Sequence, residues 1–254
     1  MGTLREVDLL LHTGTRTVIL VNPNTSRGTT SMMVELARGE LAGTGLVVEG
    51  ITVEHGPSMI VDPVTLEESA RHVVDAVRRR LTAQVAAVIV VATGDPARER
   101  LAAELDVPVV GIGQAAILAA ARGGRRFAMA TSTPLLVDSL TGLVERHGRS
   151  DGFTGVRLTS SDPVVLAASA EQQYEELAAT VRTCVEADGA EAVIIAGGPL
   201  SGTARRLSAL DLVEIVEPVP CAARLVADLV GAGAGGPVGS GPGRGSGGAP
   251  GGHL

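Results

Sequence analysis

Short apolar runs alternate with amphipathic segments along most of the chain. The apolar runs are bounded by Gly, Pro, Asn or Ser, as buried strands are, and the segments between them repeat apolar residues with helical spacing. The pattern predicts strands over 17–21, 46–53, 86–92, 107–110, 127–130, 156–159, 192–196 and 213–216. It predicts helices over 66–81, 96–105, 114–121, 134–147, 164–187, 204–210 and 221–230. Such alternation indicates an α/β fold with parallel sheets and right-handed crossovers.

The pattern of the first half recurs in the second half. Strand 87–92, its Gly/Pro turn and the next helix are matched about 105 residues later by strand 192–196, a second Gly/Pro turn and a second helix. The strand that ends at Asn22 is matched by the strand that ends at Thr131, about 109 residues later. We therefore predict two pseudo-symmetric lobes, each with a four-stranded parallel sheet flanked by helices. Because open α/β sheets bind ligands at the carboxyl ends of their strands, we expect an active-site cleft between the lobes.

The repeat also suggests boundaries for the two lobes. We expect lobe one to comprise residues 16–112 together with 213–230, and lobe two to comprise residues 113–212. We expect residues 1–15 to form a loose leader. Residues 231–254 are almost entirely Gly, Pro, Ser and Ala, a composition that buries too little apolar surface to offset the entropy of ordering. We expect them to form a disordered tail.

The composition limits the partners of this chain. Hydrophobic residues make up 45% of it, with two Phe, one Tyr and no Trp, so the core must be aliphatic and no aromatic surface is available for stacking nucleic-acid bases. The net charge of −7 disfavours binding to nucleic acids and anionic membranes. The two cysteines, Cys184 and Cys221, are too few for a disulfide framework or a metal site. Because no secretory or membrane-spanning pattern is present, we expect a cytoplasmic protein that acts on a small molecule.

Polar residues cluster after the first predicted strand of each lobe. Their amides and hydroxyls can donate hydrogen bonds to an anion, and the helix that follows adds free N–H groups and a positive dipole end. The same residue types also favour turns and helix N-caps, so each cluster alone has two interpretations. Because the two clusters occupy matched positions, we predict that they bind substrate. The candidates are Asn22, Asn24, Thr25 and Ser26 in the first lobe, and Thr131 and Ser132 in the second.

A second pair of matched turns, 93–96 and 197–199, follows the central strands. Glycine lets a ligand approach the backbone closely, so Gly197 and Gly198 are further substrate-binding candidates. We expect Asp95, which precedes a proline, to cap the following helix rather than to act as a base.

These loops resemble those of the aspartate/glutamate/hydantoin racemase superfamily. The resemblance covers about residues 16–230. It rests on Val-Asn-Pro-Asn-Thr-Ser at 21–26, Gly56-Pro57, Gly94-Asp95-Pro96, Pro-Val-Val-Gly-Ile at 108–112, the strand that ends in Thr131, and residues 192–202. The Asn-Pro-Asn-Thr and Gly-Asp-Pro motifs are similar to those of the hydantoin and allantoin racemase branch.

The resemblance implies a cofactor-independent enzyme that holds a small carboxylate or a cyclic amide between its lobes. In such enzymes one cysteine from each lobe flanks the α-carbon of the substrate. One thiolate removes the proton and the opposite thiol returns one, because inversion requires a base and an acid on opposite faces. The loops hold the carboxylate or ring carbonyl and stabilise the enolate that forms. The resemblance also implies a homo-oligomer.

The sequence departs from this pattern at the two catalytic thiols. The resemblance places the first at Ala92 or Thr93 and the second at Gly197, so both cysteines are missing. Cys221 begins the last predicted helix, where a helix N-terminus would lower the pKa of its thiol. Together with Glu217, at the end of the last predicted strand, Thr93 and Cys221 are the catalytic candidates.

Three functions are compatible with these features. The first is an isomerase or a lyase whose chemistry has diverged from two-thiol racemisation, since a sister branch resembling the arylmalonate decarboxylases needs only one cysteine. The second is a true racemase or epimerase that uses substitute groups such as Glu217 or His55. The third is a non-catalytic protein that binds a small carboxylate without forming a product.

Overall fold

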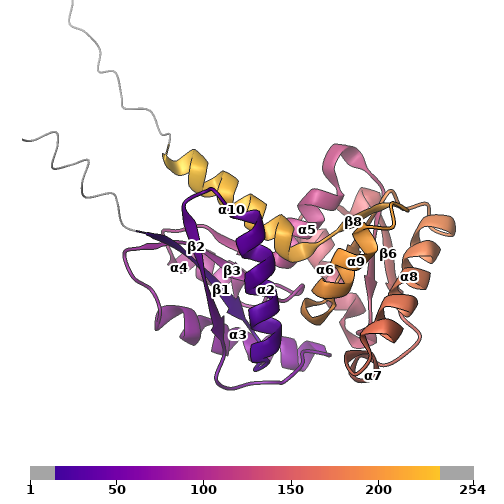
Figure 1. Cartoon of the computed structure of the whole chain (residues 1–254), viewed down its shortest axis with the longest axis horizontal. Helices are drawn as coiled ribbons and strands as arrows, with labels where there is room; N and C mark the ends of the chain where they lie inside the picture. The colour runs from indigo at the N-terminus through magenta and orange to yellow at the C-terminus, as the bar shows by residue number, and fades with distance from the viewer. Residues whose placement is uncertain (1–14, 235–254) are drawn as a thin grey trace, which may run out of the picture.

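The computed structural model describes residues 15–234, which form two lobes (Figure 1). Each lobe contains a four-stranded parallel sheet, with strand orders β2-β1-β3-β4 and β6-β5-β7-β8. The first sheet consists of β1 (Arg16–Asn22), β2 (Leu46–Thr52), β3 (Val85–Val90) and β4 (Val109–Gly111). The second consists of β5 (Phe127–Thr131), β6 (Phe153–Leu158), β7 (Ala192–Ile195) and β8 (Glu214–Val216). Because the two strand orders are equivalent, the predicted α/β fold with two pseudo-symmetric sheets is confirmed.

Helices flank both sheets. They are α2 (Arg27–Glu40), α3 (Pro63–Arg78), α4 (Arg98–Glu104), α5 (Ile112–Ala120), α6 (Val137–Arg146), α7 (Pro163–Ala167), α8 (Ala170–Glu186), α9 (Ser201–Ser208) and α10 (Pro218–Ala234). The prediction of one helix over 164–187 is wrong, because α7 and α8 are separate. Ser169 has an extended backbone, and its hydroxyl accepts a hydrogen bond from the Gln172 N–H, so a new helix begins there.

The core is aliphatic and continues from one lobe into the other. Every residue of β3 is buried, as expected for a parallel strand covered on both faces. The largest cluster of buried side chains contains Leu20 and Ile89 from the first sheet together with Met129 and Ile194 from the second. Each sheet has one further cluster of buried side chains on its outer face. Apolar packing therefore holds the two sheets in a fixed relation.

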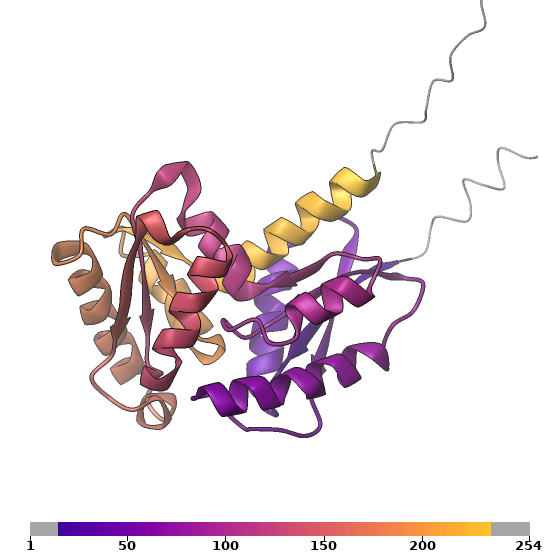
Figure 2. The same cartoon turned by 180° about the vertical axis from the view of Figure 1, so that it is seen from behind.

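Helix α10 returns from the second lobe to the first. It packs against α5 and α2 (Figures 1 and 2), with Val219 and Val226 completely buried. The strand before it, β8, pairs with β7 in the second sheet, where Ile215 lies opposite Val193. The assignment of residues 213–216 to lobe one is therefore wrong, because this strand completes the second sheet and only the helix after it packs on the first lobe.

The last helix extends further towards the end of the chain than the sequence predicted. Helix α10 continues to Ala234, so the expected tail does not begin at residue 231. The rest of the expected tail and residues 1–14 of the expected leader lie outside the described residues. Between residues 15 and 234, no helix is both long enough and apolar enough to cross a membrane.

Candidate active site

A cleft lies between the lobes at the carboxyl ends of the central strands. The loops after β1 and β3 line it from the first lobe, and the loops after β5 and β7 line it from the second. Leu66 of α3 and Leu140 of α6 add apolar surface, one from each lobe. Sequence-distant loops thus meet at one place, as the matched positions predicted.

The loop after β1 is held together by its own side chains. Asn22 is fully buried, and its amide N–H donates to Asn24 Oδ1 at 3.0 Å and to the Ser26 carbonyl at 3.1 Å. Asn24 Oδ1 also accepts the Ser26 N–H at 2.9 Å, while the Ser26 hydroxyl accepts the Thr29 N–H and caps α2. The Thr25 N–H donates to a backbone carbonyl of a neighbouring loop. Of these four predicted residues only Asn24 lines the cleft, and the other three shape its loop.

The loop after β5 brings both of its predicted residues to the cleft. Thr131 is fully buried, and its hydroxyl donates to the Ala196 carbonyl at 2.6 Å, which ties the end of β5 to the end of β7. Ser132 is buried beside it, and in residues 15–234 its hydroxyl makes no hydrogen bond. Thr131 therefore has a structural bond already, whereas Ser132 keeps a free donor for a ligand.

Thr93 presents a buried hydroxyl to the cleft. It is 6% exposed, and in the described part of the chain its Oγ1 atom has no hydrogen-bond partner. An unpaired buried hydroxyl costs roughly 1–3 kcal/mol. A ligand or a water molecule that bonds to Thr93 would recover this free energy. Thr93 is the one predicted catalytic residue that the structure places in the wall of the cleft.

Asp95 lies behind the cleft wall and caps a helix. Its carboxylate accepts the Gly113 N–H at 2.8 Å and the Gln114 N–H at 2.6 Å, at the start of α5. A β-carbon on Gly111 would lie 2.1 Å from the Asp95 carboxyl carbon, so only glycine leaves room for this contact. Burial raises the pKa of Asp95 to about 7, against the lowering effect of the two backbone hydrogen bonds. Asp95 thus caps a helix as predicted, but the helix is α5 and not α4, the next in sequence.

The turn after β7 places Gly197 and Gly198 in the cleft wall. The φ angle of Gly197 is 162°, an extended conformation that any residue can adopt. A β-carbon there would nevertheless lie 3.0 Å from Leu200 Cδ1. The buried Leu200 side chain therefore occupies the space in front of the position at which the resemblance places the second thiol.

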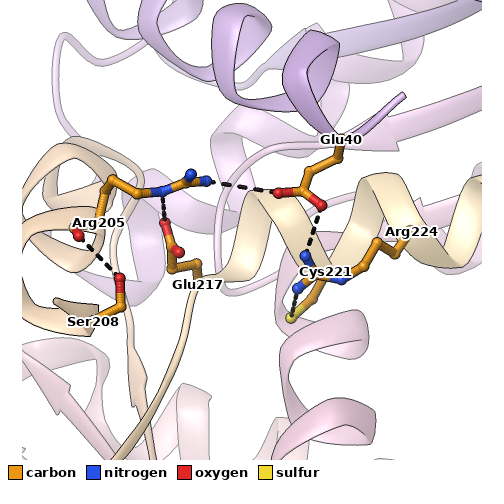
Figure 3. Close-up of polar contacts among 6 residues, drawn as sticks. All are labelled: Glu40, Arg205, Ser208, Glu217, Cys221 and Arg224. Atoms are coloured by element: carbon orange, nitrogen blue, oxygen red, sulfur yellow. Dashed lines mark hydrogen bonds and ion pairs between the residues drawn. The ribbon is translucent and has the colours of Figure 1, made fainter. Parts of the chain in front are cut away.

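Cys221 and Glu217 lie outside the cleft, in a polar cluster where α2, α9 and α10 meet (Figure 3). Glu217 pairs with Arg205 at 2.7 Å. Arg224 donates both to Glu40 at 2.7 Å and to the Cys221 sulfur at 3.5 Å. Both candidates therefore have partners away from the cleft, and we do not retain them as catalytic residues.

Helix position and burial explain why neither cysteine is an activated thiol. Helix α10 begins at Pro218, earlier than predicted, so Cys221 lies inside the helix with its N–H bonded to the Glu217 carbonyl. Burial raises the pKa of the Cys221 thiol, although the charge of Arg224 acts in the opposite direction. Burial in α8 raises the pKa of Cys184 to about 11.

Two polar residues of the cleft were missed by the sequence analysis, Ser139 in α6 and Gln173 in α8. Gln173 is 7% exposed, and its Oε1 atom accepts a hydrogen bond from the Thr203 hydroxyl at 2.5 Å. A polar residue within a helix is usually solvated, and only the packing of the lobes shows that these two face the cleft. The alternative base His55 is exposed and does not line it.

Among the described residues, no side chain that titrates near neutral pH lines the cleft. Its polar side chains are all hydroxyls and amides, from Asn24, Thr93, Thr131, Ser132, Thr133, Ser139 and Gln173. Such groups donate hydrogen bonds to carbonyl or carboxylate oxygens and stabilise negative charge that develops there. They are poor general acids or bases at neutral pH.

Comparison with known proteins agrees with the fold. A family model described as Asp/Glu/Hydantoin racemase matches residues 18–226. The hydantoin racemase of Paenarthrobacter aurescens is 25% identical over 214 residues, which are 84% of this chain and 90% of that protein. The allantoin racemase of Pseudomonas fluorescens superposes with a TM-score of 0.80 at 24% identity, covering 85% of this chain and 92% of that chain. An arylmalonate decarboxylase shares the fold, with a TM-score of 0.54 at 19% identity over 87% of this chain and 94% of that chain.

The chain therefore belongs to the Asp/Glu/hydantoin racemase family. Within that family it is similar to the hydantoin and allantoin racemases, as the loop motifs predicted.

Proposed function

We propose that this chain is an enzyme that binds a small carboxylate or a cyclic amide in the interlobe cleft and converts it without two-thiol proton exchange, as a lyase. Family membership supports an enzyme, since the hydantoin and allantoin racemases named above are enzymes. The observation that carries the proposal is the lining of the cleft, which supplies hydrogen-bond donors from both lobes and, in residues 15–234, no titratable side chain.

The lining favours a lyase over an isomerase for a chemical reason. Racemisation begins with the removal of a proton and therefore requires a base. Decarboxylation does not: the bond from the α-carbon to the carboxylate carbon breaks, CO2 leaves, and the electron pair stays on the α-carbon as an enolate. The enolate oxygen belongs to the second carboxylate on the same α-carbon, and donors such as Thr93 and Ser132 would stabilise it. A water molecule would then give its proton to the carbon, and the hydroxide that remains combines with the released CO2 as bicarbonate.

A non-catalytic binding protein is the second candidate. The same hydroxyls and amides would hold a carboxylate without acting on it, and the unpaired Thr93 hydroxyl supports a bound ligand in either case. A true racemase with substitute groups has less support, because Glu217 and His55 do not line the cleft.

The test is incubation with 2-substituted malonates and 5-substituted hydantoins in deuterated water, followed by NMR. The lyase proposal expects release of CO2 from the malonates, with one solvent deuteron taken up at the α-carbon of the product, and no exchange at C5 of the hydantoins, which have no carboxylate to lose. Deuterium exchange without loss of carbon would contradict it in favour of racemisation. Saturable binding with no product would favour the binding protein.

A matched pair of variants ties the result to the cleft. Thr93→Val keeps the shape of the side chain and removes the hydroxyl, so turnover should fall by about 100-fold if this group stabilises the enolate. Thr82→Val makes the same change at an exposed position outside the cleft and should leave turnover unchanged. Equal rates in both variants would remove Thr93 from the site.

A further inference from the structure

The turn that carries Thr93 has a strained backbone. The Asp95 N–H donates to the Ala92 carbonyl at 2.8 Å, which closes the turn shortly after β3. The φ angles of Asp95 and Ala97 are 52° and 63°, in the left-handed region that non-glycine residues rarely adopt. Such a backbone persists only where surrounding contacts hold it, and it is often found at functional sites. The turn therefore needs a support outside itself.

Helix α5 supplies that support through the side chain of Asp95. This side chain is buried, and its two carboxylate oxygens accept the N–H groups of Gly113 at 2.8 Å and Gln114 at 2.6 Å. The Asp95 carbonyl accepts the Arg98 N–H at 3.2 Å, so the backbone of Asp95 is bonded as well. The polar groups of Asp95 therefore hold the turn against the start of α5.

The same end of α5 lies directly against Thr93. A β-carbon on Gly113 would lie 2.0 Å from the Thr93 carbonyl oxygen, so the helix and this peptide group are in close contact. The next residue, Gly94, is close to α3, since a β-carbon there would lie 2.6 Å from Leu66 Cδ2. The turn is thus packed against both α3 and α5, and a movement of α5 relative to the turn would displace Thr93.

The Thr93 side chain depends on its backbone for its position. Its Oγ1 atom has no hydrogen-bond partner among residues 15–234, so no side-chain bond fixes the hydroxyl. Threonine is β-branched and restricted in χ1, so the place of its hydroxyl follows from the place of its main chain. Thr131 is different, because its hydroxyl bonds to the Ala196 carbonyl. The contact of Asp95 with α5 is therefore the means by which the Thr93 hydroxyl is held.

Helix α5 links the two lobes. It begins at the end of β4 in the first sheet, and it packs against β7 in the second sheet and against α10 (Figure 1). A group held against its first turn keeps a fixed place relative to the second lobe. Asp95 therefore helps to set the distance between Thr93 and the donors of the second lobe, such as Ser132. Stabilisation of an enolate oxygen by both lobes requires such a fixed distance, since misplaced donors lose much of their effect.

The carboxylate form of Asp95 suits this role better than the neutral acid. A carboxylate accepts both N–H groups, whereas a neutral acid resembles an amide in turning a donor towards one of them. The charged side chains that act on Asp95 are Arg98 of α4 and Arg146 of α6, and both lower its pKa, while burial raises the pKa to about 7. Helix α5 itself contains no charged residue. The carboxylate form therefore predominates above about pH 7.

We propose that Asp95 is a positioning residue for the reaction in the cleft. Its carboxylate holds the turn 92–97 against α5 and thereby fixes the Thr93 hydroxyl where the enolate oxygen forms, without touching the substrate itself. The inference rests on the proposed function, in that Thr93 stabilises that oxygen. A residue that acts in this way has no effect on turnover once the Thr93 hydroxyl is gone.

A double-mutant cycle on the decarboxylation of 2-phenylmalonate tests this dependence. At about pH 8, Asp95→Asn should lower kcat by about tenfold and change KM by less than about twofold, because the hydroxyl acts in the transition state. In the Thr93→Val background, Asp95→Asn should have no further effect on kcat. The same loss in both backgrounds, or no loss in either, would overturn the positioning role. Circular dichroism checks that each variant is folded under the assay conditions.

The pH dependence of the loss distinguishes positioning from a general structural role. The ratio of the wild-type kcat to the Asp95→Asn kcat should fall from about tenfold at pH 8 to about twofold at pH 6, since the protonated acid resembles the amide. Titration of the substrate cancels in this ratio. A ratio that does not vary with pH would overturn the role of the carboxylate.

Asp62→Asn is the matched control. The Asp62 side chain caps α3 by accepting the Thr65 N–H at 2.8 Å, and it does not line the cleft. Asparagine is an equally good cap, so this variant should keep the wild-type kcat at every pH. A loss equal to that of Asp95→Asn would show that the effect is not specific to Asp95 and would overturn the positioning role.

The position of Thr93 is also measurable without turnover. In protein with isotope labels at the threonine methyl groups, the NMR signals of Thr93 and Thr131 are identified by their loss in Thr93→Val and Thr131→Val. Asp95→Asn should shift or broaden the Thr93 signal and leave the Thr131 signal in place. An unchanged Thr93 signal would overturn the positioning role, whether or not the malonate is decarboxylated. A displaced Thr93 signal, with no turnover by the wild type, would overturn the proposed lyase and leave the link between Asp95 and Thr93 standing.

Discussion

The side chain of Leu200 stands in front of Gly197, with its Cδ1 atom 3.0 Å from the position that a β-carbon would take. Leu200 is 3% exposed and belongs to the buried apolar cluster of the second sheet, so a shift of its side chain would disturb that packing. We predict that Gly197→Ala lowers the free energy of unfolding by about 1–3 kcal/mol, as overpacking does. Urea denaturation measures this change. A thiol at this position would meet the same obstacle, so Gly197→Cys alone should not restore proton exchange.

Two further variants test whether the contact with Leu200 causes the loss of stability in Gly197→Ala. Gly39→Ala, at an exposed position of α2 with no atom within 4 Å of the new β-carbon, should raise stability by about 0.5–1 kcal/mol. Adding Leu200→Ala to Gly197→Ala should cost less than the two single changes together. Strictly additive losses would show that the two side chains do not compete for space.

Thr93 and Thr131 differ in what their hydroxyls bond, although both line the cleft. Thr131→Val removes the 2.6 Å hydrogen bond to Ala196 and should lower the free energy of unfolding by about 1–2 kcal/mol. Thr93→Val removes a hydroxyl that has no partner in the described part of the chain, so stability should stay the same or rise by about 1 kcal/mol. Thermal and urea unfolding of the two variants decide the matter. An equal loss in both would mean that Thr93 has a structural bond.

The pKa of Asp95 makes stability depend on pH. The pKa is about 7 in the folded protein and 3.8 without burial, so the folded state holds this proton more tightly than the unfolded state. The contribution of Asp95 to the free energy of unfolding is therefore largest below pH 3.8 and falls as the pH rises to about 7. Asp95→Asn removes this titration and keeps the shape of the side chain.

We compare the free energy of unfolding of the wild type with that of Asp95→Asn at each pH. The wild-type value minus the variant value should fall by up to about 4 kcal/mol between pH 3.8 and about 7, and should be constant above pH 7. Urea titrations at several pH values measure the difference. Asp75→Asn, on the exposed side of α3, makes the same change without burial and serves as the control. A difference that does not vary with pH would contradict the raised pKa.

Cys221 should be slow to react in the folded protein. Burial raises the pKa of its thiol, so little thiolate is present at neutral pH, and the side chain is only 7% exposed. In a Cys184→Ser background, alkylation by iodoacetamide should be at least about tenfold slower in the folded than in the unfolded chain, and faster as the pH is raised. Mass spectrometry follows the reaction. Equal rates in the folded and unfolded chains would return Cys221 to the catalytic candidates.

Much of the fold could be predicted because its signals are local or periodic. Apolar runs and amphipathic segments placed the strands, and the matched loops after β1 and β5 predicted both the second sheet and the cleft. The strand over 213–216 was assigned to the wrong lobe, because its sequence does not record which sheet edge it joins. The break between α7 and α8 depends on one capping contact of Ser169, which competed with an otherwise helical pattern.

The sequence by itself determined the two-lobed α/β architecture, the family resemblance and the residues, Ala92, Thr93 and Gly197, at the positions to which the resemblance assigns thiols. Only the tertiary structure decided which polar groups share a site. Cys221 and Glu217 carry suitable chemistry but bond to Arg224 and Arg205 away from the cleft, whereas Gln173 was indistinguishable from a solvated helix residue until the lobes packed. The physical reason is that side-chain type is encoded at each position, while orientation and burial are set by contacts between residues far apart in the chain.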